Sequence, residues 1–142
     1  KGDRIPDIDH VSRYCPPRTV ENGDILATAF MLKVRDEYLS VNWLEFFEVV
    51  GRDAQLAKVR KSMQLTRAAT ARLAVLNVGL SCEYVRKNSF DTRELMFTHE
   101  PITEPGKEDE SHSGIFNTKS ENPLDIAELL VACIEEHYSA RS

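Results

Sequence analysis

The order of short strand-like and helix-like segments is the feature that most constrains the fold of this chain of 142 residues. Polar turns separate these segments, and no apolar run approaches the roughly 20 residues that span a bilayer. The order is a hairpin, helices, a strand, a helix, a second hairpin and a final helix, unlike the regular βαβ alternation of a doubly wound sheet. We therefore expect one compact α+β domain over residues 1–142, with a mixed or antiparallel sheet packed against helices and a C-terminal amphipathic helix.

The first part of the chain predicts an irregular arm followed by a hairpin. Three prolines within residues 1–20 favour an irregular N-terminal arm, with at most a short element near residues 11–14. The run at 25–34 is apolar on both alternating faces, which is typical of a central strand covered on each side. Apolar and polar residues alternate over 38–43, which predicts the second strand of a hairpin with 25–34.

The remaining elements follow from local periodicity. A helix capped by Asp53 is expected after Gly51, and a second helix should begin at Asn122 and bury a stripe that ends at Tyr138. Between them we expect strands over 71–78, 93–99 and 112–117 and a short helix over 79–88. Residues 100–111 contain two prolines, a glycine and an acidic cluster, and therefore predict an exposed, mobile acidic loop.

Composition limits the class of protein. The formal net charge is −5, which argues against general coating of nucleic acid, and the three cysteines are widely spaced without a C-x-x-C pair. These features favour a reducing cytoplasm and predict no metal site and no cofactor. Neither a G-x-x-x-x-G-K phosphate loop nor a G-x-S-x-G nucleophile motif is present.

The run from Asp9 to Pro16 concentrates side chains that can carry chemistry. His10 can transfer protons and Arg13 can hold phosphate, so both are candidate catalytic residues. The alternative is that both residues tie the N-terminal arm to the body of the protein by hydrogen bonds.

His99 and His112 form a second candidate catalytic group. They lie at the facing ends of two expected strands, so a hairpin with a long loop could bring the imidazoles together as a proton-transfer pair or as two metal ligands. Two ligands are too few for a structural zinc site. The alternative is that each histidine is hydrogen-bonded at the end of its strand.

Aromatic residues follow the expected strand over 38–43. Trp43, Phe46 and Phe47 are expected in the core, with an exposed patch for a partner as the alternative. Ser40 and Asn42 share the other face of that strand, where they either line a pocket or meet solvent.

Basic residues gather between positions 52 and 72, where six basic side chains oppose one acidic side chain and give a local net charge of +5. On the expected helix they form an outer face that can meet phosphate or an acidic protein. The candidate partner-binding residues are Lys58, Arg60, Lys61 and Arg67. The alternative is an ordinary solvated helix face, and there is no aromatic platform or helix-turn-helix pattern for specific nucleic-acid recognition.

Four motifs resemble a group of short uncharacterised bacterial proteins. They are D-H-V-S-R-Y-C-P at 9–16, L-S-V-N-W-L-E at 39–45, L-A-V-L-N-V-G at 73–79 and H-S-G-I at 112–115. The resemblance covers most of the chain and implies a bacterial, single-domain origin. The group has no known activity, so the resemblance implies no functional residue.

Two functional hypotheses remain. The first is a small accessory or interaction module without catalysis, which contacts a protein, or a nucleic-acid complex, through the basic helix or the acidic loop. The second is a small, toxin-like hydrolase or phosphoryl-transfer enzyme, in which the three histidines and Arg13 converge in one cleft. No membrane partner is expected.

Overall fold

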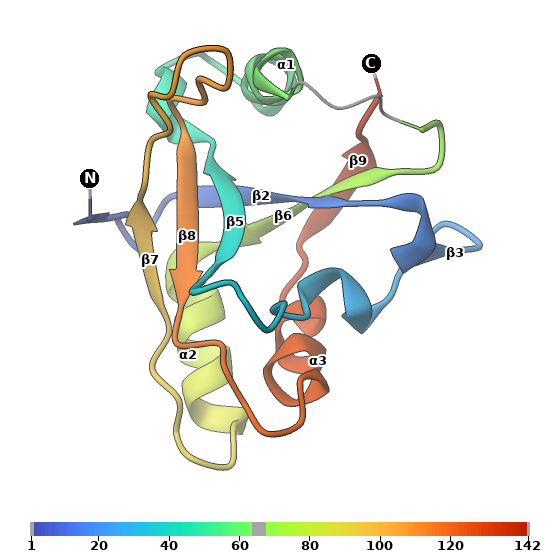
Figure 1. Cartoon of the computed structure of the whole chain (residues 1–142), viewed down its shortest axis with the longest axis vertical. Helices are drawn as coiled ribbons and strands as arrows, with labels where there is room; N and C mark the ends of the chain where they lie inside the picture. Colours follow the sequence, from blue (N-terminus) through green and yellow to red (C-terminus); the bar gives the residue numbers. More distant parts are fainter. Residues whose placement is uncertain (1, 64–67, 142) are drawn as a thin grey trace.

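A seven-stranded antiparallel sheet organises the chain in the computed structural model, which describes residues 2–63 and 68–141 (Figure 1). The strand order is β1-β7-β8-β5-β2-β6-β9, and every neighbouring pair is antiparallel. The strands are β1 (Asp3–Arg4), β2 (His10–Cys15), β5 (Leu39–Trp43), β6 (Arg72–Asn77), β7 (Met96–His99), β8 (His112–Phe116) and β9 (Glu136–Ser139). A separate two-stranded hairpin contains β3 (Val20–Glu21) and β4 (Asp24–Ile25). The expected α+β domain is confirmed.

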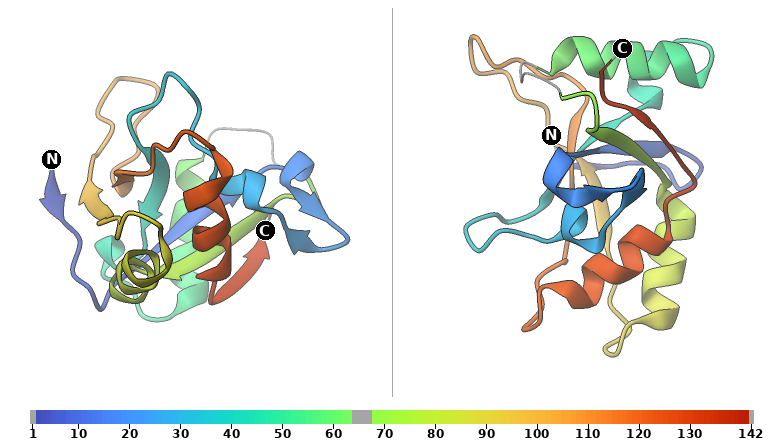
Figure 2. Two further views of the ribbon diagram at one scale, coloured as in Figure 1. Left: turned by 90° about the horizontal axis from the view of Figure 1, so that it is seen from below. Right: turned by 90° about the vertical axis from the view of Figure 1, so that its right-hand side faces the viewer.

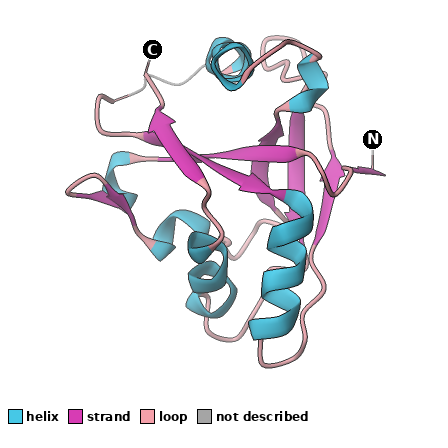
Figure 3. Ribbon diagram, turned by 180° about the vertical axis from the view of Figure 1, so that it is seen from behind, coloured by secondary structure: helices cyan, strands magenta, loops and turns pink. Residues whose placement is uncertain are grey.

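Helices cover both sides of this sheet. They are α1 (Arg52–Ser62), α2 (Val78–Asn88) and α3 (Leu124–Ala132), with short 3₁₀ turns η1 (Pro17–Thr19), η2 (Ala27–Phe30) and η3 (Glu45–Phe47). Helices α2 and α3 lie side by side below the sheet (Figure 3), whereas α1 lies at the opposite end of the molecule (Figure 2). Strands β7, β8 and β5 cross β2 and β6 steeply, so the sheet is strongly twisted (Figure 1).

Two hydrophobic cores result from this arrangement, and β6 contributes to both. Ala74 and Leu76 of β6 face the larger core under α2, α3 and η2. Leu73 and Val75 face the smaller core under α1. A strand buried on both faces needs apolar residues at successive positions, which explains the continuous apolar run of β6.

The irregular arm expected over residues 1–20 contains the short element allowed near residues 11–14, but this element is longer and more central than expected: it is strand β2 (His10–Cys15). Strand β2 lies inside the sheet, between β5 and β6. The prolines of the N-terminal segment misled the interpretation, because they flank this strand rather than interrupt it. Proline removes a backbone donor only at its own position, so Pro6 and Pro16 do not prevent pairing between them.

The expected central strand over 25–34 and its hairpin with 38–43 are also wrong. Only Asp24–Ile25 pairs, and it pairs with β3, whereas Leu39–Trp43 pairs with β2 and β8. The apolar run continues into η2, whose Ala29 and Phe30 are buried against the larger core. Apolar residues on all sides of a short turn give the same pattern as a covered strand.

The final helix ends at Ala132, not near Tyr138. The chain then forms β9, the edge strand beside β6. Arg72 donates to the backbone oxygen of His137 at 3.2 Å, and Arg60 donates to that of Ser139 at 2.6 Å. These two guanidinium groups donate hydrogen bonds to carbonyl oxygens of the edge strand, so those oxygens are less available to pair with a strand of another chain.

Several other expectations are confirmed with small shifts of boundary. Helices α1 and α2, strand β6 and the antiparallel pair β7–β8 lie where periodicity predicts them. The cap of α1 is Gly51 rather than Asp53, and no side chain caps it. Residues 100–111 form a loop with one isolated bridge between Ile102 and Asp109, and its mobility stays a prediction. Within the described residues, no helix is long and apolar enough to cross a membrane.

Candidate functional site

The register of β7 and β8 places His99 and His112 on opposite faces of the sheet. His99 pairs with Ser113, so the next residue of β8, His112, projects from the other face. The Nε2 atom of His99 is hydrogen-bonded to the backbone oxygen of Glu110 at 2.7 Å. The Nδ1 atom of His112 is hydrogen-bonded to the backbone oxygen of Glu100 at 2.8 Å. The expected hairpin forms, but it does not bring the imidazoles together.

His10 and Arg13 are separated in the same way, because positions three apart on a strand face opposite sides. Glu45 accepts from the backbone N–H of His10 and contacts its Nδ1, both at 2.7 Å, while Nε2 lies 3.6 Å from Glu135. Arg13 donates to the backbone oxygens of Ala29 at 2.9 Å and Ser40 at 2.8 Å. Both side chains thus make the structural hydrogen bonds considered above.

Strand pairing therefore divides the four candidate catalytic residues between two faces. His10 and His112 project from the face under α1, whereas Arg13 and His99 project from the face under α2 and α3. Five of the surface cavities formed by the described residues have volumes between 300 and 790 Å³. None of the four residues lines any of the five, so the structure does not place them in one of these clefts.

The aromatic residues at the end of β5 and in η3 lie in different surroundings: Trp43 packs against the larger core, whereas Phe46 belongs to neither core and contacts the rings of Trp43 and Phe47. The rings of Trp43 and Phe46 lie 5.3 and 5.0 Å from that of His99, and Phe47 packs against the core under α1. Trp43 also donates to Asp9 at 2.9 Å. Asn42 donates to Asp109 and Ser111, each at 2.9 Å, which fixes the end of the acidic loop to the sheet.

The basic face of α1 is smaller than the sequence suggests. Lys58 and Lys61 are exposed, but Arg60 is directed to the end of β9, where it binds the backbone oxygen of Ser139. Arg67 lies outside the described residues. Of the three candidate partner-binding residues that the structure describes, two lysines one turn apart therefore remain exposed.

A groove on the α1 face of β8 is the more distinctive surface. Residues 37–38, residues 100–104 and Phe116 line it, and its volume is 600 Å³. No helix in the described part of the chain lies over this end of the sheet (Figure 1). We name it the acid-rimmed groove, because Glu37, Glu100 and Glu104 are among these residues.

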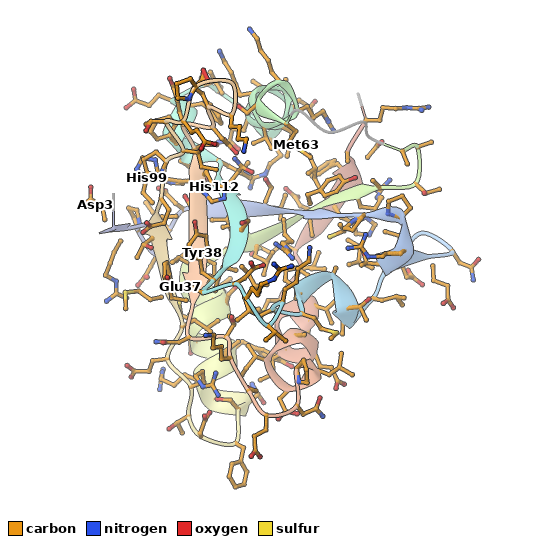
Figure 4. All side chains as sticks on the ribbon, in the orientation of Figure 1. Asp3, Glu37, Tyr38, Met63, His99 and His112 are labelled. Carbon is orange, nitrogen blue, oxygen red and sulfur yellow. The ribbon has the colours of Figure 1, made fainter. Side chains whose placement is uncertain are left out.

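Its aromatic floor depends on a glycine. A side chain at Gly114 would overlap the ring of Tyr38, whose Cγ lies 2.7 Å from the position of an ideal Cβ. The tyrosine ring therefore packs directly on the strand, 4.8 Å from the ring of Phe116 and 5.9 Å from that of His112. Figure 4 shows Glu37, Tyr38 and His112 along β5 and β8, with His99 beside β7.

The carboxylates give the groove a negative potential. Thr98, a buried residue on the same face as Glu100, donates its hydroxyl to that carboxylate at 2.8 Å and holds it on the sheet. Burial raises the pKa of the Tyr38 phenol, and the negative charges of Glu100, Glu37 and Asp36 raise it further. Glu104 pairs with Lys107 at 3.2 Å, so among the carboxylates that line the groove the negative potential comes mainly from Glu37 and Glu100.

Sequence reasoning missed this groove, although its residues lie within or beside motifs that it noted. The H-S-G-I motif contains Gly114 and is followed by Phe116, but nothing local shows that Tyr38 covers the glycine. That contact depends on the register between β5 and β8, in which Ser40 pairs with Gly114. A glycine within an expected strand was the available signal, since such glycines often mark close approach of another group.

Comparison of the chain with protein-family models, with curated proteins and with solved structures finds no match. Within residues 2–63 and 68–141, no group of three or more His, Cys, Asp or Glu side chains is arranged to hold a metal ion. Any function is therefore inferred from the geometry described above.

Proposed function

We propose that this chain is a non-catalytic interaction module that binds a protein partner in the acid-rimmed groove. The observation that carries the proposal is the half-buried pair of Tyr38 and Phe116, which lies uncovered in a groove of 600 Å³. Aromatic side chains with an apolar body and a polar margin are enriched at protein interfaces, where they bury much area at low entropic cost.

The catalytic hypothesis has less support. An enzyme of the proposed type needs its proton carriers and its phosphate anchor within reach of one substrate position. The four candidates instead project two from each face of the sheet, and each is hydrogen-bonded to the protein. These bonds stabilise strand ends and the turns η2 and η3.

Binding through α1 also has less support than binding through the groove. Lys58 and Lys61 still present positive charge, but Arg60 is engaged by β9. Two exposed lysines supply little of the charge that phosphate binding requires. A nucleic-acid complex as partner therefore depends on the weaker of the two surfaces.

Site-directed photocrosslinking tests the proposal. A photoreactive amino acid at Thr103, on the groove, should give a discrete adduct with a partner in an extract of the source cells, whereas one at Glu83, on α2, should not. Phe116→Ala should abolish the adduct, because it removes half of the aromatic pair. Phe90→Ala removes an equally large but fully exposed ring elsewhere and should leave the adduct intact.

A double variant distinguishes the two surfaces. Lys58→Glu combined with Lys61→Glu should not affect the adduct if the groove binds the partner. An adduct that disappears in this variant and persists in Phe116→Ala would assign binding to α1 instead. Circular dichroism of each variant shows whether the fold is retained.

A further inference from the structure

The charge around the groove indicates the chemistry of its occupant. Among the described residues, neither Glu37 nor Glu100 forms an ion pair, so both retain an uncompensated negative charge beside the Tyr38 ring. A phosphate or an acidic segment would be repelled here. A cation is attracted both by the carboxylates and by the face of an aromatic ring.

Resting on the proposed function, we propose that the groove binds an extended basic segment of a partner protein, with one Lys or Arg side chain placed over Tyr38 beside Glu100. The two groups that would hold the cation are already fixed. Thr98 holds the Glu100 carboxylate, and Gly114 seats the tyrosine ring. Groups that are ordered before binding lose less entropy when the ligand arrives, which favours affinity.

The far side of Phe116 sets the direction of the segment. A neighbouring cavity of 420 Å³ shares Glu37 and Phe116 but also contains Lys119 and Arg93. Arg93 is paired with Asp91 at 2.9 Å, whereas Lys119 is exposed. The negative potential is therefore strongest toward Glu100, and the cationic side chain of the partner should lie at that end.

The size and openness of the groove favour an extended segment over a folded surface. A volume of 600 Å³ accommodates a few side chains, and the rim of residues 100–104 stands beside the sheet face. Extended peptides that bind such grooves place alternate side chains into pockets. One basic side chain at the Tyr38 position and an apolar neighbour against Ile102 fit this arrangement.

Peptide titration followed by NMR tests the inference on the full chain. The probes are a blocked nonapeptide of alternating Arg and Ala and a matched peptide with Gln in place of Arg. The Arg peptide should bind at least about tenfold more tightly than the Gln peptide and should shift the signals of Tyr38, Gly114 and Phe116. Raising the salt concentration should weaken it, because the groove is exposed to solvent.

Single charge removals locate the site. Glu100→Gln and, independently, the exposed Glu37→Gln should each weaken the Arg peptide several-fold, while Lys119→Glu should strengthen it. Glu21→Gln removes the same charge from the exposed β3–β4 hairpin and should leave the affinity unchanged. The inference is overturned if Glu21→Gln weakens binding equally, or if the shifted signals lie outside the groove.

Failure of the inference and failure of the proposed function give different results. Equal binding of the Arg and Gln peptides, together with a crosslink that still depends on Phe116, would reject a basic occupant and leave the interaction module standing. If no crosslink that depends on Phe116 forms but the Arg peptide still binds selectively, the proposed function is rejected, and the preference of the groove for a basic segment stands.

Discussion

Gly114 shapes the groove by what it lacks, because the ring of Tyr38 occupies the space that a β-carbon would fill. Its backbone is ordinary extended strand, so an alanine there meets no conformational strain. The three atoms nearest to such a β-carbon all belong to the tyrosine ring, which cannot bend away as the end of a flexible chain would. A single methyl group therefore probes whether Tyr38 occupies the described position.

Gly114→Ala should displace Tyr38 and lower the free energy of unfolding by about 1–3 kcal/mol, the usual cost of overpacking. In a Tyr38→Ala background the same substitution should cost much less, because the colliding ring is absent. Urea unfolding of the four proteins of this cycle measures the difference. An equal cost in both backgrounds would show that Tyr38 does not lie on Gly114.

At the scale of elements, Arg13 links η2 to the sheet. Its guanidinium donates to backbone oxygens of Ala29 in η2 and Ser40 in β5, and burial lowers its pKa from the ordinary value. Such a partly buried charge is tolerated because carbonyl dipoles replace the lost water. Sequence reasoning predicted a strand where η2 lies and a mainly irregular arm where β2 lies. Arg13 of β2 thus attaches η2 to the sheet.

Arg13→Met should lower the free energy of unfolding by about 2–4 kcal/mol, because it leaves two backbone oxygens without their donors while keeping most of the side-chain volume. Arg18→Met, in the exposed turn η1, removes the same charge and should change stability by less than about 0.5 kcal/mol. Chemical denaturation measures both. Similar small losses in the two variants would contradict the structural role of Arg13.

Helix α1 and strand β9 are linked by Arg52 and Glu136, at 2.8 Å. The hydrogen bond from Arg52 is the main cause that lowers the pKa of the Glu136 carboxyl below its ordinary 4.5. A lowered pKa means that the pair stabilises the fold above about pH 4.5 and that this contribution is lost as the pH falls through the folded-state value. Because both side chains are partly exposed, the contribution should stay below about 1 kcal/mol.

Arg52→Met should therefore cost more stability at pH 7 than at pH 3. Unfolding by urea at the two pH values, for wild type and variant, gives the comparison. The part of the lost stability that comes from the hydrogen bond between Arg52 and Gln55 should be the same at both pH values. A loss that does not change with pH would show that the ion pair contributes nothing measurable.

Sequence patterns predicted those elements whose signals are local. The helix expected after Gly51 and the strand expected over 71–78 are confirmed, since Leu56 and Val59 lie on one buried helix face and β6 is a short apolar run. β9 was missed because Tyr138 fits the spacing of a helix as well as that of a strand. The groove required the pairing of β5 with β8, which lies about seventy residues away in sequence and leaves no local signal.

At the scale of the whole molecule, the two cores share one sheet and should unfold together. Strand β2 pairs with β6 along its whole length, across roughly sixty residues of sequence, so neither core can form without long-range pairing. Cys15 lies at the end of β2, fully buried, and burial is the main cause that raises the pKa of its thiol to about 11. This thiol therefore reports on opening of the sheet.

In a Cys82→Ser, Cys133→Ser background, which removes the two half-buried thiols, Cys15 should react with a thiol reagent at pH 8 far more slowly than a free cysteine. A pKa of about 11 instead of 9.0 lowers the thiolate fraction about a hundredfold, and burial blocks access as well. Reaction should then require unfolding, so its rate should rise with urea in parallel with the unfolded fraction.

The raised pKa also predicts that stability is retained below pH 9 and declines as the pH rises toward 11, because only the unfolded thiol releases its proton in that range. A Cys15→Ala variant should lose the part of the alkaline decline that this thiol contributes. Rapid labelling of native Cys15 would instead show that the end of β2 opens independently of the rest of the sheet.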